Sequence, residues 1–295
     1  MLELNYSDYI TADPGKFEAV SAVLYDVTSN TVLYRKNSEK AMFPASTTKI
    51  MTAYVALKYL PADYRITVGS EVTLLAPDSS LAYLSQGFVL TLEDALYALL
   101  LPSGNDAAYT IAVNTARYVS KNSMLSDTQA VEYFCELMNE EAEKAGAYHT
   151  HFCNPDGYHD VFHYTTAEDM IRISMLTKEY PLISQIVSAP FRETTLISGE
   201  KRYWENGNLL VLSDSQYYVP YATGLKTGFT DEAGYSMVAS AEKDGHELIA
   251  VVLKASSLKG RYTDAANLIY SVFEPEKAFP VPVTEKPEET QIPEE

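Results

Sequence analysis

The stretch "PASTTKIMTAYVALKYL", residues 44–60, opens with hydroxyl residues and continues into an apolar run whose only charge after Lys49 is Lys58. A helix that is apolar on nearly every side is typical of a buried element, so we expect this one inside the fold. Ser46 precedes Lys49 by three positions, a spacing that places Cβ atoms about 5–6 Å apart on a helix. The serine hydroxyl and the lysine amine are therefore expected to share a hydrogen bond.

Burial would change the chemistry of this lysine. Its neighbours one turn away are small, namely Ala45, Ser46, Thr52 and Ala53, which leaves room for a long side chain against the helix. A desolvated ammonium is disfavoured, so the pKa of Lys49 should fall and a neutral amine could act as a base. The alternative is ordinary: hydroxyl residues that start a helix, followed by a solvated lysine.

The same spacing recurs at Ser198/Lys201 in "SGEK" and at Ser256/Lys259 in "SSLK". The first of these copies lies in a polar segment with glycines, and the second runs into a glycine directly after the lysine. Neither is followed by an apolar helix. The spacing alone is therefore unspecific, and the surroundings of residues 44–60 distinguish that copy.

Composition excludes some classes of function. The chain has 295 residues, of which 46% are hydrophobic, and a formal net charge of −18, which argues against nucleic acid as a partner. Residues 274–295 are rich in proline and glutamate and are expected to form a flexible tail. No run approaches about 18 apolar residues, and no secretory signal opens the chain. Cys135 and Cys153 are expected as free thiols, although their spacing leaves a disulfide open.

The pattern of strands and helices predicts a mixed α/β (α+β) fold. Residues 21–27 and 31–36 read as a hairpin, and residues 221–229, 234–242 and 246–255 read as three later strands. Helical periodicity occupies the middle of the chain and returns at about 260–273. We expect one antiparallel sheet built from both chain ends, with a helical insertion at roughly 60–190, in a domain that covers residues 1–273.

Two further stretches place polar groups where a cleft would use them. "LLLPSGNDAA", residues 99–108, puts Ser103 and Asn105 in a corner between apolar helices, although a turn with a helix cap explains the same letters. "GLKTGFT", residues 224–230, puts Lys226, Thr227 and Gly228 in a strand. There the glycine would admit a second backbone while the lysine and threonine bind a carboxylate. The alternative is a solvated strand end.

A serine-x-x-lysine with a Ser-x-Asn and a Lys-Thr-Gly is the motif set of penicillin-binding proteins and class A β-lactamases. The chain resembles the low-molecular-weight penicillin-binding proteins, which are serine D-alanyl-D-alanine carboxypeptidases with a β-lactamase/transpeptidase-like fold. The resemblance covers roughly residues 20–273, in the family's order. It rests on "FPASTTKIMTA", "LYALLLPSGNDAA", "FCNPDGYHDVFHYTTAEDM", "ENGNLL" and "GLKTGFTDEAGYSMVASA".

The resemblance implies a role for each motif residue. Ser46 would be the acylated nucleophile, Lys49 its base and Ser103 a proton relay to the leaving group. Asn105 would hold the peptide amide of the substrate.

The resemblance also implies how the substrate is held. The terminal carboxylate would meet Lys226, Thr227 and Arg261, and the backbone N–H groups of Ser46 and Phe229 would form the oxyanion hole. Phe229 stands where many relatives carry a larger polar residue, and Arg261 could also be a solvated residue at a helix start. The implied partners are peptidoglycan stem peptides and β-lactams. No cofactor or metal is implied, and the implied location is outside the cytoplasm, with membrane attachment only through segments that this chain lacks.

Other functions remain open on the same residues. A β-lactamase would need a glutamate to activate water, and Glu136 in "ELMN" mimics the pattern, although periodicity around it predicts a helix. A D,D-endopeptidase would use the same serine and lysine. A metallohydrolase could use the cluster from His149 to His163, which includes His151, His159, Asp156 and Asp160. A module that only binds peptidoglycan would have no use for the catalytic motifs.

Overall fold

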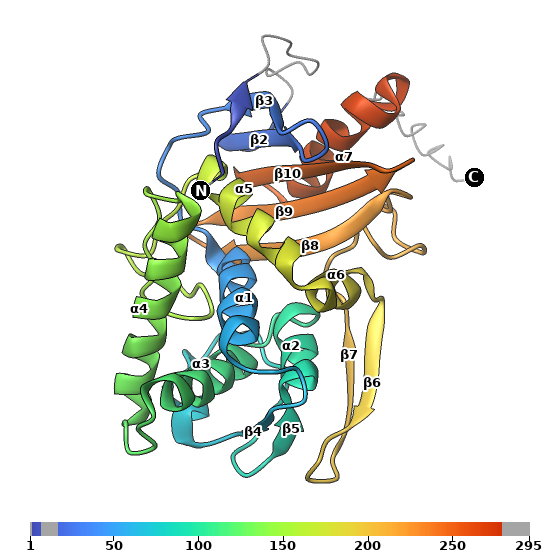
Figure 1. Ribbon diagram of the computed structural model, residues 1–295. Helices are drawn as coiled ribbons and strands as arrows, with labels where there is room; N and C mark the ends of the chain where they lie inside the picture. The colour runs from blue at the N-terminus through green and yellow to red at the C-terminus, as the bar shows by residue number, and fades with distance from the viewer. Residues whose placement is uncertain (1, 7–16, 279–295) are drawn as a thin grey trace, which may run out of the picture.

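The computed structural model describes residues 2–6 and 17–278. Its centre is a six-stranded sheet in the order β1-β3-β2-β10-β9-β8. All neighbouring strands are antiparallel except β1 and β3, which run parallel. In Figure 1 the blue strands of the N-terminal part lie beside the orange strands of the C-terminal part. The strands are β1 (Asn5–Tyr6), β2 (Ser21–Asp26), β3 (Thr31–Lys36), β8 (Ala222–Thr230), β9 (Gly234–Lys243) and β10 (His246–Ala255).

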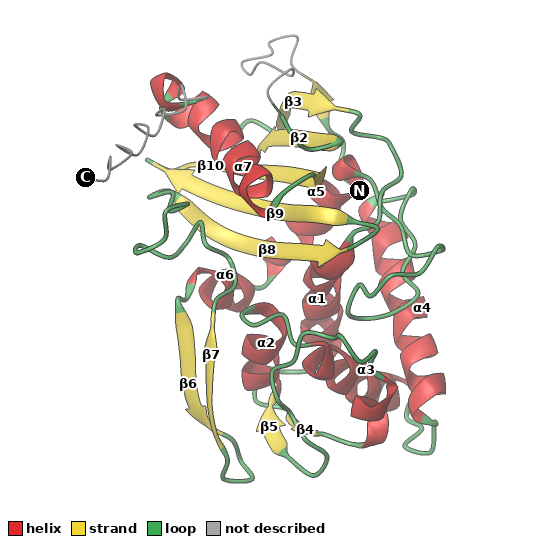
Figure 2. Ribbon diagram, turned by 180° about the vertical axis from the view of Figure 1, so that it is seen from behind, coloured by secondary structure: helices red, strands yellow, loops and turns green. Residues whose placement is uncertain are grey.

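Helices cover both faces of this sheet, and strand β10 shows why. Its residues alternate between two hydrophobic cores: Ile249 and Val251 belong to the core under the helical region, whereas Leu248 and Ala250 belong to the core under α7 (Leu258–Phe273). Because both faces are covered, the middle of the strand is a nearly continuous apolar run. Figure 2 shows α7 lying across β9 and β10 on the face opposite to the helical region.

The helical region lies between β3 and β8 in the sequence. It contains η2 (Ala45–Thr48), α1 (Lys49–Tyr59), η3 (Ser70–Leu74), α2 (Leu92–Leu100), α3 (Asn105–Ser120), α4 (Asp127–Ala145), α5 (Ala167–Leu176), η4 (Thr177–Glu179) and α6 (Pro181–Ser188). It also contains two short hairpins, β4 (Arg65–Thr67) with β5 (Val89–Thr91), and β6 (Phe191–Thr195) with β7 (Lys201–Glu205).

Local sequence sets the ends of several of these helices. Ser126 caps α4 through a capping box with Gln129, and Gly146 ends the same helix in the left-handed conformation. Thr91 and Thr166 accept backbone N–H groups at the starts of α2 and α5. These caps satisfy donors that the helix itself leaves unpaired.

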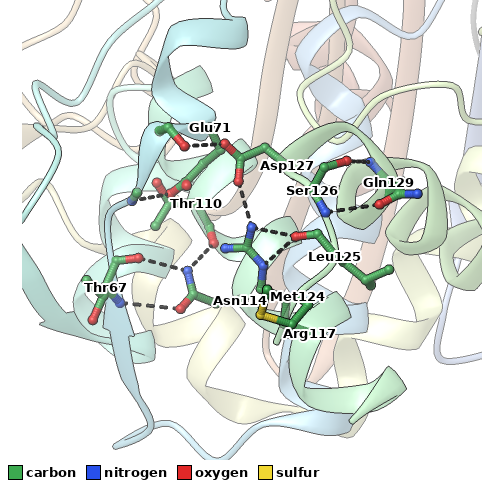
Figure 3. A network of polar contacts seen from close by, with 12 residues as sticks. Thr67, Glu71, Thr110, Asn114, Arg117, Met124, Leu125, Ser126, Asp127 and Gln129 are labelled. Carbon is green, nitrogen blue, oxygen red and sulfur yellow. Dashed lines mark hydrogen bonds and ion pairs between the residues drawn. The ribbon is translucent and has the colours of Figure 1, made fainter. Parts of the chain in front are cut away.

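A polar network joins the outer part of the helical region (Figure 3). The Asn114 side chain exchanges hydrogen bonds with the backbone of Thr67, which joins α3 to β4. Arg117 donates to the carbonyl of Leu125 and forms an ion pair with Asp127 at 2.8 Å, which joins α3 to the start of α4. These contacts tie β4, α3 and the start of α4 together.

The helix of residues 44–60 is buried as its sequence indicates. Residues 49–56 of α1 are all buried, and α1 packs between α3, α4 and α5 (Figure 1). The expected hairpin, the three later strands and the last helix are likewise confirmed. One detail differs: Ser46 lies in the 3-10 turn η2 and α1 begins at Lys49, because the turn bonds back to Pro44 before the helix starts.

Some elements were not expected from the sequence. The hairpin β6–β7 stands away from the main sheet and includes Lys201, in a segment whose sequence indicates only that it is polar and contains glycines. Cys135 and Cys153 are free thiols, as expected. No helix among the described residues is long and apolar enough to cross a bilayer. Most of the expected tail, residues 279–295, lies outside the described residues.

Candidate active site

The turn that carries Ser46 is held between two glycines. A Cβ atom at Gly228 on β8 would lie 2.9 Å from the Ser46 backbone nitrogen, and one at Gly157 would lie 1.9 Å from the Ala45 carbonyl oxygen. Only glycine admits backbones this close. Gly157 also has φ of +84°, which favours glycine. The turn that carries Ser46 is therefore fixed from both sides, and the Ser46 side chain is half-buried at the floor of a cleft.

Lys49 is fully buried, and its amine makes three hydrogen bonds. Nζ lies 2.9 Å from Ser46 Oγ, 2.8 Å from Asn105 Oδ1 and 2.7 Å from the Asp156 carbonyl oxygen. Burial lowers the pKa of Lys49 to about 8, against the opposing effect of the Asp156 and Asp106 carboxylates. A neutral amine has one lone pair, which can take the proton of the adjacent serine.

Asp156 was not identified from the sequence as part of this site. It lies in the tight "NPDG" loop, where Asn154 Oδ1 accepts the N–H of Gly157. The loop aims the Asp156 carbonyl at Lys49 from 107 residues further along the chain. Burial raises the pKa of the Asp156 carboxyl, and the charge of Lys49 opposes that shift. The sequence Asn-Pro-Asp-Gly indicates a turn, but it does not indicate which helix the turn faces.

The corner before α3 brings Ser103 and Asn105 to the same cleft. Ser103 has φ of +64°, and its buried hydroxyl has no hydrogen-bond partner among the described residues. Asn105 is buried and accepts from Lys49, so its amide is fixed by the amine of Lys49. Asp106 holds the facing loop by accepting the N–H groups of Ala82 and Leu84. The corner therefore forms part of the cleft and is more than a turn with a helix cap.

Strand β8 supplies the other wall. Lys226 is buried and donates to the carbonyl of Thr227 at 3.0 Å. Burial lowers the pKa of Lys226 well below its ordinary value, and the positive charges of Lys49 and Arg261 add to this shift. Because β8 is the last strand of the sheet, one of its edges is free to pair with an extended peptide.

Arg261 reaches the same wall from α7. Its guanidinium donates to the carbonyl of Gly228 at 3.2 Å and stacks at 4.8 Å over the ring of Tyr262. The residue is only 5% exposed, so the alternative of a solvated residue at a helix start is wrong. Tertiary packing of α7 on the sheet buries it. Phe229, in contrast, is half exposed, and its ring lies 4.5 Å from that of Tyr235.

These residues line one cleft with a volume of about 600 Å³. Its floor and walls include Ser46, Ser103, Asn105, Thr227, Gly228, Phe229 and Arg261. Lys49 and Lys226 lie beneath this surface because both are buried. The arrangement combines a hydroxyl beside a low-pKa amine, a buried hydroxyl without a partner among the described residues, and the buried basic side chains of Lys226 and Arg261 along a strand at the edge of the sheet. Such a site can acylate a serine with a substrate that ends in a carboxylate.

The residues that a β-lactamase or a metallohydrolase would use do not come together in a comparable arrangement. Glu136 lies on α4, as periodicity indicates, and it is exposed on that helix. His163 is buried, with Nε2 2.8 Å from Thr48 Oγ1 and Nδ1 3.1 Å from the Cys153 backbone nitrogen. His163 therefore supports the turn that carries Ser46.

Within residues 2–6 and 17–278, no group of three or more histidine, cysteine or acidic side chains could hold a metal ion. The alternative metal site between His149 and His163 is therefore not formed.

Comparison with known proteins agrees with this geometry. Residues 8–257 match the family model of the S11 peptidases, described as D-alanyl-D-alanine carboxypeptidases. A D-alanyl-D-alanine carboxypeptidase of Bacillus subtilis, DacF, is 31% identical over 90% of this chain. This chain spans 64% of the length of that relative. A D-alanyl-D-alanine carboxypeptidase of Streptomyces sp. K15 is 32% identical over 82% of each chain.

Solved structures give the same result. The Streptomyces K15 DD-transpeptidase superimposes with a TM-score of 0.79 and 30% identity, covering 88% of this chain and 98% of its own. Penicillin-binding protein D2 of Listeria monocytogenes, solved with ampicillin bound, superimposes with a TM-score of 0.71 and 28% identity over the same shares. The expected fold is confirmed, and the chain belongs to the S11 family of serine peptidases, the D-alanyl-D-alanine carboxypeptidases.

Proposed function

We propose that this protein is a serine D-alanyl-D-alanine carboxypeptidase that removes the terminal D-alanine from peptidoglycan stem pentapeptides. The observation that carries the proposal is the 2.9 Å contact between Ser46 Oγ and the buried amine of Lys49. Catalysis is assigned to Ser46, Lys49 and Ser103. Substrate binding is assigned to Asn105, Lys226, Thr227, Gly228 and Arg261.

Acylation begins with the neutral amine of Lys49. It takes the proton of Ser46 as the oxygen attacks the carbonyl carbon of the penultimate D-alanine. The oxyanion then sits between the backbone N–H groups of Ser46 and Phe229; in other enzymes one such donor contributes about 10²–10³ in rate. The unpartnered hydroxyl of Ser103 passes a proton to the leaving amine, and D-alanine departs. Water later hydrolyses the ester.

The two cations of β8 and α7 explain why a free carboxylate matters. Without a ligand, Lys226 is disfavoured as an ammonium because it is buried beside other positive groups. A bound carboxylate favours the charged form of Lys226, and that charge in turn disfavours protonation of Lys49. Binding of the correct chain end therefore prepares the base. A substrate that ends in an amide would leave these cations unpaired.

β-Lactams are proposed as covalent inhibitors, because the ring is a strained acyl donor that Ser46 can attack. Glu136, the glutamate that a class A β-lactamase would use here to activate water for deacylation, is exposed on α4. We therefore expect a long-lived acyl-enzyme rather than turnover, which separates this protein from a class A β-lactamase.

Members of the family are enzymes of the cell envelope. For this chain we infer an extracytoplasmic location, because peptidoglycan lies outside the membrane. We also infer that residues 1–273 form the catalytic domain and that residues 274–295 lie outside it. The family match over residues 8–257 and the end of α7 at Phe273 support this division.

The proposed function is tested by incubation with a muropeptide that carries a pentapeptide, followed by chromatography for free D-alanine. We expect release in the wild type and none in Ser46→Ala. A peptide acid should be cleaved far faster than its C-terminal amide, and Arg261→Ala should reduce that preference. Equal rates for acid and amide would instead favour a D,D-endopeptidase, which cuts within a chain.

A further inference from the structure

A buried tyrosine beside Arg261 uses every hydrogen bond that its hydroxyl can make. The Tyr262 hydroxyl donates to the Gly207 carbonyl at 3.0 Å. It accepts from the Leu209 backbone N–H and from Nη2 of Arg261, each at 3.3 Å. A hydroxyl has one proton and two lone pairs, so this set is complete. Because Tyr262 is 1% exposed, its oxygen is held by these three groups of the protein rather than by bulk water.

Arg261 and Tyr262 are consecutive residues of α7, and a helix does not by itself bring such neighbours together. Consecutive side chains point about 100° apart around the helix, whereas positions three or four apart share a face. Nevertheless, the guanidinium carbon of Arg261 lies 4.8 Å from the centre of the Tyr262 ring. The ring of Tyr217 stacks on the same tyrosine, also at 4.8 Å. Specific contacts, rather than helix geometry, therefore draw the arginine towards Tyr262.

These contacts hold part of the guanidinium and leave another part free. In the described part of the chain, Arg261 donates two hydrogen bonds, one to Tyr262 and one to the carbonyl of Gly228. An arginine has five N–H groups, and the buried Nε of Arg261 has no acceptor among the described residues. Arg261 also lines the catalytic cleft. Held in this way, the guanidinium keeps unused donors for a carboxylate, which arginine can bind through two parallel hydrogen bonds.

The same hydroxyl also holds a second part of the cleft wall. Gly207 lines the cleft, and its N–H donates to the carbonyl of Leu101 at 3.0 Å, two residues before Ser103. Tyr262 donates to the carbonyl of that same glycine. One phenol therefore connects the guanidinium on α7 with the loop that is hydrogen-bonded to the Ser103 corner.

We propose that Tyr262 is a positioning residue, whose hydroxyl orients Arg261 towards the C-terminal carboxylate of the substrate and so sets the preference for acids over amides. The inference rests on the proposed function and adds to it a residue that acts through another, since Tyr262 is not among the residues that line the cleft. Removal of the hydroxyl leaves Nη2 of Arg261 without its acceptor. The guanidinium can then take orientations that do not match a bound carboxylate.

The variant Tyr262→Phe keeps the ring and removes only the hydroxyl. Two peptides report on it: Nα,Nε-diacetyl-lysyl-D-alanyl-D-alanine and the same peptide with a C-terminal amide. Release of D-alanine or of its amide gives kcat/KM for each, and the ratio of acid to amide measures how well the carboxylate is read. This ratio should fall about tenfold in Tyr262→Phe, the lower end of what a hydrogen bond to a charged group contributes. Both peptides are measured on one enzyme preparation, so a loss of folded protein cancels.

A double-mutant cycle separates positioning of Arg261 from a general disturbance of the cleft. In the Arg261→Ala background, Tyr262→Phe should leave the remaining ratio within about twofold, because the residue through which it acts is gone. The matched control is Tyr25→Phe. It removes a hydroxyl from an equally buried tyrosine that donates to Asn30 at 2.7 Å on the N-terminal hairpin, and it should keep the ratio of the wild type.

A tenfold fall in Tyr262→Phe that is absent from the Arg261→Ala background and from Tyr25→Phe supports the inference. An unchanged ratio in Tyr262→Phe overturns it and leaves the proposed function intact, since the acid is still cleaved in preference to the amide. A fall of the same size in the Arg261→Ala background, or in Tyr25→Phe, also overturns it, because the effect then does not pass through the arginine. No release by the wild type, or equal rates for acid and amide, overturns the proposed function and this inference together.

Discussion

In the first copy of the Ser-x-x-Lys spacing, Lys49 is fully buried and lies 2.9 Å from Ser46. In the second copy, Ser198 is in a hairpin turn where it bonds to the backbone of Val89, and Lys201 is exposed. The serine and the lysine are three positions apart in each case, yet only the first pair lies at the start of a buried helix. The comparison teaches that burial, rather than spacing, converts a lysine into a base.

The third copy differs in another way. Ser256 and Ser257 both donate to Glu18, and Lys259 is exposed at the start of α7. Ser256 therefore contacts a carboxylate, and Lys259 lies on the surface in contact with water. A helix start is therefore also insufficient, because water solvates the charged form of the amine.

The largest expected effect comes from removing the buried lysine. Lys49→Ala should slow acylation by a fluorescent penicillin by about 10³-fold, since a positioned general base contributes about 10²–10⁴. The matched controls Lys201→Ala and Lys259→Ala should stay within about twofold of the wild type, because exposed substitutions leave the cleft unchanged. A comparable loss in either control would break the comparison.

The second expected effect is a pH profile set by Lys49. Burial lowers its pKa to about 8, so about one molecule in ten has the neutral amine at pH 7. Acylation by penicillin should rise about tenfold per pH unit below 8 and level off above it. A lysine with the ordinary pKa would instead drive the rise up to about pH 10.4. Stopped-flow rates between pH 6 and 9.5 distinguish the two, and a flat profile contradicts the assignment.

The third expected effect concerns the glycine under the nucleophile. In Gly228→Ala the new Cβ would lie 2.9 Å from the Ser46 backbone nitrogen, so the turn must shift. Misplacement of about 1 Å costs about 10²-fold in catalysis, and we expect a loss of this order in acylation rate. The control Gly245→Asn changes a glycine with no atoms near its Cβ and should stay within about twofold. Unchanged acylation in Gly228→Ala would show that the close approach is dispensable.

The smallest expected effect is on stability, through the histidine that supports the turn. Nδ1 of His163 accepts the Cys153 N–H, so Nε2 carries the proton and donates to Thr48. Burial lowers the pKa of His163 to about 3, so the unfolded chain binds a proton below pH 6.5 that the folded chain refuses. Its contribution to stability is present above pH 6.5 and declines by about 1.4 kcal/mol per pH unit as pH falls towards 3.

Urea unfolding at pH 7, 5 and 4 measures this decline. His163→Gln should lower the free energy of unfolding at pH 7 by about 1–3 kcal/mol, through its lost hydrogen bonds, and should show a shallower decline with acid. The carboxylates contribute equally to the pH dependence of stability in both proteins, so the difference in slope isolates the effect of the histidine. Identical slopes would mean that His163 is not held neutral in the folded chain.

Much of the fold could be predicted because its signals are local. The strands around Val23 and Ile249 and the buried helix after Lys49 follow from the periodicity of apolar residues. The hairpin β6–β7 could not be predicted in the same way, because its apolar residues alternate with polar ones on a small sheet with exposed faces. A short alternating run between glycines carries too weak a signal.

The residues of the site likewise include some that the sequence predicts and some that it does not. Residues inside motifs could be placed by spacing, whereas contacts between distant segments could not. The Asp156 carbonyl meets Lys49 across 107 positions, and Arg261 meets Gly228 across 33 positions. Such contacts depend on how the elements pack, and the sequence of either segment alone does not encode them.

The most direct test of the central claim is to locate the covalent adduct with penicillin. Intact mass spectrometry and peptide mapping should show one penicilloyl group on Ser46 in the wild type and none in Ser46→Ala. Ser198→Ala and Ser256→Ala should label like the wild type. An adduct that persists in Ser46→Ala, or that maps to Ser198 or Ser256, would contradict the claim that burial selects one serine-lysine pair among three.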